Sequence, residues 1–142
     1  MFARLRPETL DLVTKTNGWT DDEVGRLTGE DEIHVSSIRR DGSARPPVTM
    51  WMVTDGGSVY VRSVKGVDGL WYRHVRATDR GHVTASGVAA DVVVEDASQD
   101  SALASRLDAA YREKYRRYAA GTVGSVVTPA AKASTLRLTP RR

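Results

Sequence analysis

The chain has 142 residues, 40% of them hydrophobic, and a net charge of +3, so it is long enough and apolar enough for one folded domain. No apolar run approaches the roughly 18 residues of a membrane-spanning helix. The absence of cysteine excludes disulfides, thiol nucleophiles and cysteine–metal sites. Because no apolar signal core follows the first residues, we expect a cytoplasmic protein that has no membrane contact.

Two helices are predicted before the first strand. The first spans 7–15, where Pro7 suits an initial helical position. The second begins at Thr20, whose hydroxyl and the carboxylate of Glu23 form the pattern of a capping box. Trp19 and Val24 flank this cap as a hydrophobic staple, and Gly29 ends the helix.

The middle of the chain is typical of short antiparallel strands joined by turns. Gly56 and Gly57 follow Asp55 and are a strong hairpin signal. Six strands are predicted, over 32–39, 48–53, 59–64, 70–76, 82–86 and 91–95. A long helix over 99–118, capped by Ser98, and a last strand over 134–138 follow. This order indicates an α+β fold, mainly β, with a barrel or sandwich and an appended helix.

Polar residues gather where two of these strands end. Ser63, Lys65 and the amide of Gly66 are placed to converge on a phosphate group. Arg62, Arg73 and Arg76 are either part of such a cationic rim or ordinary solvent-facing strand residues. The pattern leaves both interpretations open.

The long helix carries a lysine among its apolar positions. Lys114 falls on the stripe of Leu103 and Leu107, so it must find a counter-charge such as Asp91 or Glu95, extend its ammonium group to solvent, or face a cavity. Tyrosines gather on the same helix, and we expect them to pack against the sheet rather than to stack on a ligand. They are Tyr111, Tyr115 and Tyr118.

The remaining chemistry-bearing residues give weaker signals. The three histidines fit no metal-binding pattern, so no metal is expected. His74, beside Tyr72, is a candidate acid or hydrogen-bond donor. No nucleophile elbow, Walker loop or dinucleotide-binding glycine pattern is present. Nucleic-acid binding is a weak alternative, and it would use Arg112, Arg116 and Arg117.

Several separated motifs agree in order with one bacterial family. They are Arg40-Asp-Gly-Ser, Pro47-Val-Thr-Met-Trp51, Val59-Tyr-Val-Arg-Ser63, Gly69-Leu-Trp-Tyr-Arg73, Ala110-Tyr-Arg-Glu-Lys-Tyr115 and Ala133-Ser-Thr-Leu-Arg-Leu-Thr-Pro140. The chain resembles the family catalogued as domain of unknown function 2255. That family is similar to the FMN-binding split-barrel superfamily, which includes pyridoxamine-phosphate-oxidase-like proteins and deazaflavin-dependent nitroreductases.

The resemblance implies one domain over 1–142, built as a six-stranded antiparallel split β-barrel. A helical segment over 1–30 would precede the barrel strands at 31–96, a helix over 98–119 and the last strand at 133–139. It also implies a flavin-type cofactor, FMN or deazaflavin F420, and oxidoreductase activity on a small organic substrate. The residues that would hold the cofactor are Arg45, Ser63, Lys65, Gly66, Trp71 and Arg73. Tyr72 or His74 would donate a proton.

The resemblance further implies a homodimer whose site lies between the subunits. Two positions differ from the deazaflavin-dependent branch: His74 stands where Asn is common, and Leu70 where Pro is usual. These differences favour an alternative in which the barrel keeps its pocket without a cofactor. The protein would then be a small-molecule-binding module or an enzyme of specialised metabolism.

Overall fold

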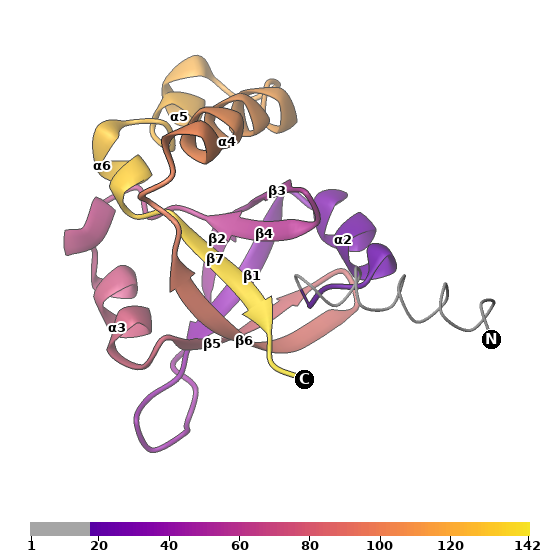
Figure 1. Cartoon of the computed structure of the whole chain (residues 1–142), viewed down its shortest axis with the longest axis vertical. Coiled ribbons are helices and arrows are strands. Elements are labelled where there is room, and N and C mark those ends of the chain that lie inside the picture. Colours follow the sequence, from indigo (N-terminus) through magenta and orange to yellow (C-terminus); the bar gives the residue numbers. More distant parts are fainter. Residues whose placement is uncertain (1–17) are drawn as a thin grey trace, which may run out of the picture.

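The computed structural model describes residues 18–142. The helix expected over 7–15 lies outside these residues. Within them, one antiparallel sheet curls into a nearly closed barrel, and helices cover its outside (Figure 1). The α+β barrel class expected from the sequence is confirmed, with seven strands in place of six.

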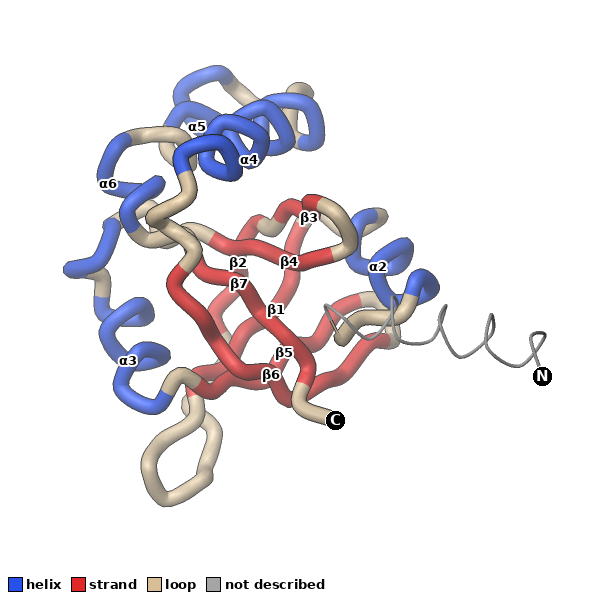
Figure 2. The backbone as a smooth tube through the Cα atoms, viewed as in Figure 1, coloured by secondary structure: helices blue, strands red, loops and turns tan. Residues whose placement is uncertain are grey.

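The sheet runs in the order β2-β1-β5-β6-β7-β4-β3 (Figure 2). The strands are β1 (Glu32–Ser37), β2 (Val48–Trp51), β3 (Val53–Asp55), β4 (Ser58–Val61), β5 (Arg80–Ala85), β6 (Val88–Asp96) and β7 (Leu136–Pro140). Strands β2 and β3 form the two edges of the sheet, yet only Met52 separates them along the chain. The expected single strand over 48–53 is therefore wrong, because the chain turns at Met52 from one sheet edge to the other.

The β3–β4 hairpin confirms the glycine signal. Gly56 and Gly57 both have positive φ, at 58° and 81°, which a tight primed turn requires. Asp55 and Ser58 pair directly across this turn.

Five α-helices and one 3₁₀ turn accompany the sheet in the described part of the chain. They are α2 (Asp21–Thr28), η1 (Gly66–Asp68), α3 (Leu70–Thr78), α4 (Ser101–Lys114), α5 (Ala120–Gly124) and α6 (Pro129–Ala133). Helix α2 begins with the expected capping box: Thr20 Oγ1 accepts from the Glu23 amide at 3.1 Å, and Glu23 Oε1 accepts from the Thr20 amide at 3.0 Å. Helix α4 is capped by Asp100 instead of Ser98.

The strand expected over 70–76 is wrong, because this segment is helix α3. Gly69 precedes it in an extended conformation, and Tyr72 and Val75, one turn apart, face the barrel interior. Trp, Tyr and Val favour strands intrinsically, but burial of this stripe decides the local structure.

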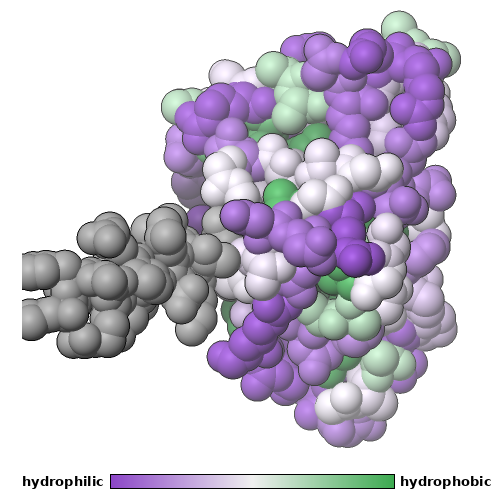
Figure 3. Space-filling model, turned by 90° about the vertical axis from the view of Figure 1, so that its right-hand side faces the viewer, coloured by the Kyte–Doolittle hydropathy of each residue, from purple (hydrophilic) through white to green (hydrophobic). Residues whose placement is uncertain are grey.

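Two apolar clusters stabilise the fold. One fills the barrel and includes Trp19, Ile33, Met52 and Leu138. The second joins the β3–β4 hairpin to α4 through residues such as Leu107 and Tyr111. On the face in Figure 3, hydrophilic and intermediate residues cover much of the surface, and the most hydrophobic residues show in recesses between them.

Candidate functional site

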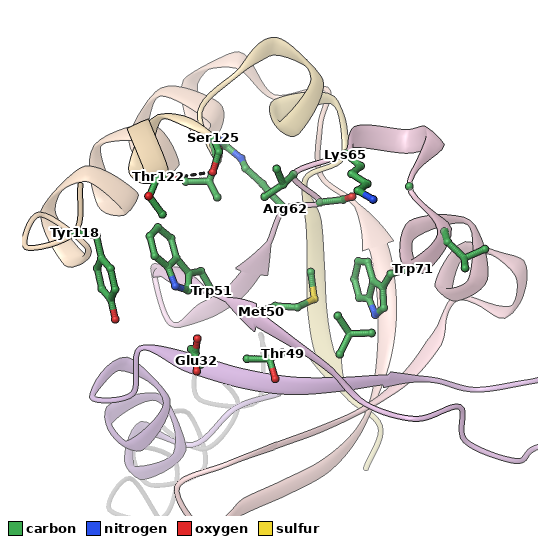
Figure 4. A pocket seen from close by; sticks show the side chains of 16 residues that line it. Glu32, Thr49, Met50, Trp51, Arg62, Lys65, Trp71, Tyr118, Thr122 and Ser125 are labelled. Atoms are coloured by element: carbon green, nitrogen blue, oxygen red, sulfur yellow. Dashed lines mark hydrogen bonds between the residues drawn. The ribbon is translucent and has the colours of Figure 1, made fainter. Parts of the chain in front are cut away.

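A cavity of about 640 Å³ opens between the barrel and the helices that follow α4 (Figure 4). Its walls come from β1 and β2, the end of β4, the first turn of α3 and the segment from Tyr118 to Val126. The lining residues are Glu32, Val48, Thr49, Met50, Trp51, Arg62, Ser63, Val64, Lys65, Gly69, Leu70, Trp71, Tyr118, Thr122, Ser125 and Val126. The volume suits a drug-sized or cofactor-sized ring system.

One wall of the cavity is a fixed aromatic stack. The ring of Trp51 lies parallel to that of Tyr115, with centroids 3.9 Å apart and an interplanar angle of 3°. The Tyr115 hydroxyl donates to the Asp31 carbonyl at 2.6 Å and accepts from the Met52 amide at 3.0 Å. Tyr118 tilts against Trp51 at 5.0 Å. Because Tyr115 is tied to the backbone, Trp51 presents a rigid face to the cavity.

Trp71 forms the opposite wall, beside Met50 (Figure 4). It lies in the first turn of α3, and its half-buried ring packs against the barrel core. Its Nε1 atom is buried and has no hydrogen-bond partner in the described part of the chain. An unpaired buried donor carries a desolvation cost of about 1–3 kcal/mol.

The Ser63–Lys65 segment also lines the cavity, and two glycines shape it. Gly66 has a φ of 73°, and its amide donates to the Ser63 carbonyl at 2.9 Å, so that amide is already used. A Cβ on Gly69 would come within 2.9 Å of Ser63 Oγ and 3.2 Å of Lys65 Cβ. Gly69 therefore leaves the room that Ser63 and Lys65 occupy.

Lys65 is an unpaired cation at the cavity rim. Its side chain is exposed, and within residues 18–142 its ammonium group makes no hydrogen bond or ion pair. Glu32, on β1, supplies a carboxylate from the side of the cavity opposite to Lys65 (Figure 4). The cavity thus combines aromatic walls with one free positive charge and one negative charge.

Arg62 lines the same cavity but is fully committed to the fold. Its side chain is entirely buried and pairs with Asp108 at 2.6 Å. It also donates to Thr135 Oγ1 and to the Val126 carbonyl, each at 3.0 Å. The solvent-facing interpretation of Arg62 is wrong, because its partners on α4 and after α5 enclose it. Lys132 completes the network, 3.0 Å from Asp108.

The structure brings together only some of the residues expected at the site. Ser63, Lys65 and Trp71 line the cavity. The residues outside the cavity lining are Arg45, Gly66, Tyr72, Arg73 and His74. Tyr72 is buried in the barrel core, where burial raises the pKa of its hydroxyl.

Sequence reasoning missed several cavity residues, namely Glu32, Met50, Thr122 and Ser125. Nothing in their local pattern marks them, because they come from separate segments that only the fold assembles. Trp51 carries a partial signal, because it is a large aromatic residue on a predicted strand.

Lys114 meets neither carboxylate that the sequence suggested. Its ammonium group donates to the Met52 carbonyl at 3.0 Å and lies over the Tyr115 ring at 5.2 Å. Asp91 pairs with His82, and Glu95 pairs with Arg137. Burial lowers the pKa of Lys114 to about 8. Lys114 is therefore a half-buried cation held by a backbone carbonyl and an aromatic face.

The three tyrosines predicted on the long helix differ in burial and in their distance from the cavity. Tyr111 and Tyr115 are buried against the β3–β4 side of the sheet, as expected. Tyr118 lies at the cavity mouth and donates to Asp31 at 2.8 Å. In residues 18–142, no cluster of three or more His, Cys, Asp or Glu side chains could hold a metal ion.

A family model described as "Uncharacterized protein conserved in bacteria (DUF2255)" matches residues 23–138. The chain belongs to this family. No curated protein sequence matches the chain significantly. Among the described residues, no helix is both long and apolar enough to cross a membrane.

Solved structures show the same fold at low identity. A conserved hypothetical protein from Mycobacterium tuberculosis has a TM-score of 0.61 and 16% identity, over 90% of this chain and 85% of its own. A FAD-binding protein from Mesorhizobium loti has a TM-score of 0.55 and 15% identity, over 87% and 91%. A protein named F420 reductase has a TM-score of 0.52 and 18% identity, over 83% and 92%. The likeness establishes a split β-barrel architecture that this chain shares with flavin-type proteins.

Proposed function

We propose that this protein binds a flavin-type cofactor, FMN or deazaflavin F420, in the cavity and acts as an oxidoreductase on a small organic substrate. One observation carries the proposal: a cavity walled by Trp51 and Trp71 holds an unpaired cation, Lys65, at its rim. Planar apolar walls suit a tricyclic ring, and a free ammonium group suits a phosphate. The shared fold with a FAD-binding protein and an F420 reductase supports it.

The residues of the cavity fit such a group in three ways. Trp51 is held flat by its stack on Tyr115, so it orients a ring without losing side-chain freedom. The orphaned Nε1 of Trp71 is a donor that a small movement of the ring would offer to a ligand carbonyl. Ser63 and Lys65 both line the cavity, and they would supply a hydroxyl and a charge for phosphate.

A bound flavin or deazaflavin supplies hydride transfer, and the protein supplies position and electrostatics. Met50 and the two tryptophans exclude water from the ring site. Ser63 and Lys65 fix the anionic end. Tyr72 lies in the barrel core and His74 lies outside the cavity lining, so the proposed roles of this chain are binding and orientation of the ring.

The test begins with the visible spectrum of the purified protein, followed by titration with FMN and with F420. The double variant Ser63→Ala/Lys65→Ala should bind the cofactor at least about tenfold more weakly, because each lost charge-assisted hydrogen bond contributes about 1.5–3 kcal/mol. Arg112→Ala removes an exposed arginine on α4 and is the matched control. Unchanged affinity in the double variant would sink the site assignment.

We also propose that two copies of the chain close the cavity mouth. Val48, Val64 and Leu70 line the cavity and are 41%, 56% and 59% exposed, an unusual set of apolar side chains to leave in water. A second copy packed on this rim would bury them. Leu70→Glu should convert a dimer to a monomer in light-scattering measurements, and a wild-type protein that is monomeric at all concentrations contradicts the proposal.

Glu32 favours a second candidate, a cofactor-free module that binds a small molecule. Its carboxylate faces a cavity that would otherwise suit an anionic ligand. Glu32→Gln separates the two candidates. The substitution should strengthen FMN binding if the first proposal holds. Loss of binding to a cationic or neutral ligand, with no flavin bound by either form, would favour the second.

A further inference from the structure

A basic surface lies beside the cavity, formed by the β1–β2 loop and by α3 with the first residue of β5. Segments 39–45 and 73–80 contain six arginines and two aspartates, a local charge of +4 in a chain whose net charge is +3. The charged residues are Arg39, Arg40, Asp41, Arg45, Arg73, Arg76, Asp79 and Arg80. This surface therefore accounts for the whole positive excess of the protein.

The two segments are fixed to one another by hydrogen bonds. Thr78 Oγ1 donates to the Ile38 carbonyl at 2.7 Å, and the Ile38 amide donates to the Arg80 carbonyl at 3.1 Å. Ile38 also forms a bridge with Ala44, which closes the base of the β1–β2 loop. The loop and the helix thus hold their side chains in a defined arrangement.

His74 lies one turn before Thr78 on α3, and three arginines of this surface are near enough to repel its charged form. Arg39 donates to Ser43 Oγ at 3.3 Å and to the Ala44 carbonyl at 3.2 Å, and Arg45 donates to Ser37 Oγ at 3.4 Å. Within residues 18–142, neither of these arginines nor Arg73 forms an ion pair.

The carboxylates nearest to this cluster are engaged elsewhere. Asp41 accepts from the amide and the hydroxyl of Ser43, at 2.9 and 2.7 Å. Asp79 lies 3.3 Å from Arg76. Arg39, Arg45 and Arg73 therefore form no salt bridge with these carboxylates in residues 18–142, although the charge of Asp41 still acts on Arg39.

The pKa of His74 reflects the positive charges near it. Desolvation, followed by repulsion from Arg45, Arg73 and Arg39, lowers the pKa of its imidazole. The basic run just after α4 is different: Arg116 pairs with Glu113, and Arg117 pairs with Asp31. Gathering like charges without counter-charges costs free energy, and a bound anion would recover it.

We propose that Arg39, Arg45, Arg73 and His74 form an anion site outside the cavity, and that this site binds a phosphate group of a small molecule. Guanidinium groups match phosphate oxygens in a planar, two-point geometry that lysine cannot copy. The site does not depend on the identity of the cavity ligand.

The position of the site suits one phosphate group rather than a nucleic-acid strand. The cluster covers one loop and one helical turn, whereas strand binding needs a track of several phosphate contacts. His74 lies one turn beyond Leu70 and Trp71, which line the cavity. The phosphate is therefore either free or carried by a molecule that reaches from the cavity mouth.

Histidine NMR signals test the site directly, because the described chain offers two internal controls. Inorganic phosphate, titrated against chloride at constant ionic strength, should shift the ring signals of His74 saturably and raise its pKa. His34 and His82 lie on β1 and β5, and their signals should stay in place. His74→Gln assigns the signal. Equal shifts of all three histidines, or no shift, would overturn the proposal.

Arginine variants then separate a shaped site from diffuse charge. Arg73→Ala should weaken phosphate binding by roughly tenfold, and Arg73→Lys by several-fold, because it keeps the charge but loses the two-point contact. Arg112→Ala should change affinity less than about twofold. If Arg73→Lys binds like wild type and Arg112→Ala binds like Arg73→Ala, the site is only general charge and the proposal fails.

Three further titrations identify the source of the phosphate. If FMN moves the His74 signal at lower concentration than inorganic phosphate and riboflavin does not move it, the flavin phosphate lies at this site, and its assignment to Ser63 and Lys65 is wrong. Equal affinities for FMN and inorganic phosphate indicate a free phosphate compound. Both outcomes support the site. Tighter, steeply salt-dependent binding of a single-stranded oligonucleotide would overturn the choice of a small molecule.

Discussion

Arg62 and Lys65 both follow the end of β4 and are three residues apart, but Arg62 is buried and paired whereas Lys65 is exposed and unpaired in the described residues. Arg62 turns inward, where Asp108, Thr135 and a backbone carbonyl saturate its guanidinium group. Lys65 turns outward to the cavity rim and has no partner in the described residues. A charge whose donors are all used stabilises the fold, and one whose donors are free is available to a ligand.

The largest expected effect on stability comes from removing the buried cation, Arg62. Arg62→Met leaves Asp108 buried with Lys132 as its remaining partner, and it should lower the free energy of unfolding by about 3–5 kcal/mol. Urea unfolding measures this loss. Arg106→Ala is the control. Arg106 lies on α4, the helix that also carries Asp108, and it pairs with Asp55 at the surface. The control should cost less than about 1 kcal/mol, and equal losses in the two variants would contradict the comparison.

A smaller effect is expected at Gly69, whose lack of a side chain leaves room for Ser63 and Lys65. Gly69→Ala places a Cβ 2.9 Å from Ser63 Oγ, so it should cost about 1–3 kcal/mol and weaken cofactor binding together with stability. Thermal unfolding and FMN titration measure the two effects. Gly121→Ala is the control, since no heavy atom lies within 4 Å of its Cβ. If both substitutions behave alike, the close approach at Gly69 has no consequence.

The smallest effect concerns a third cation, Lys114, which contacts the Met52 carbonyl and the Tyr115 ring and forms no salt bridge in the described residues. Burial lowers its pKa from 10.5 to about 8, so between these pH values the unfolded chain binds more protons than the folded chain. Its contribution to stability should therefore rise as pH increases through this range. After allowance for its solvent-exposed part, the rise should be about 1 kcal/mol or less.

The variant Lys114→Met tests this contribution. The difference in unfolding free energy between wild type and variant, measured in urea at pH 7 and pH 9.5, isolates Lys114 because the tyrosines titrate in both proteins. The methionine variant should lack the rise. Identical pH slopes in the two proteins would show that the lysine is not desolvated in solution.

The sequence predicts much of this fold because many of its signals are local. The Thr20–Glu23 capping box and the glycine pair at 56–57 each act within four residues, and both are confirmed. Helix α3 shows the limit of local signals. Leu70–Arg76 alternates like a strand, and only the barrel wall that buries Tyr72 and Val75 makes it a helix.

The site is less predictable because its partners are distant in sequence. Arg62 meets Asp108 across 46 residues, and no strand pattern distinguishes it from a solvent-facing arginine. Ser63, Lys65 and Trp71 could be predicted at the cavity because they follow closely along the chain. Arg45, Arg73 and His74 were expected at the same site, but the helical path of α3 and the β1–β2 loop gather them on a neighbouring surface.

Because the sheet is interrupted at Met52, β2 is an edge strand with backbone groups that are free to bind a ligand. Strand β2 pairs with β1 on one side only, so its other side keeps backbone N–H and C=O groups outside the sheet ladder. Thr49, Met50 and Trp51 of this edge strand line the cavity. A flat heterocycle placed there would meet donors and acceptors at the regular spacing of a strand, whatever side chains the strand carries. We expect substitutions of the β2 side chains to leave these backbone groups in place.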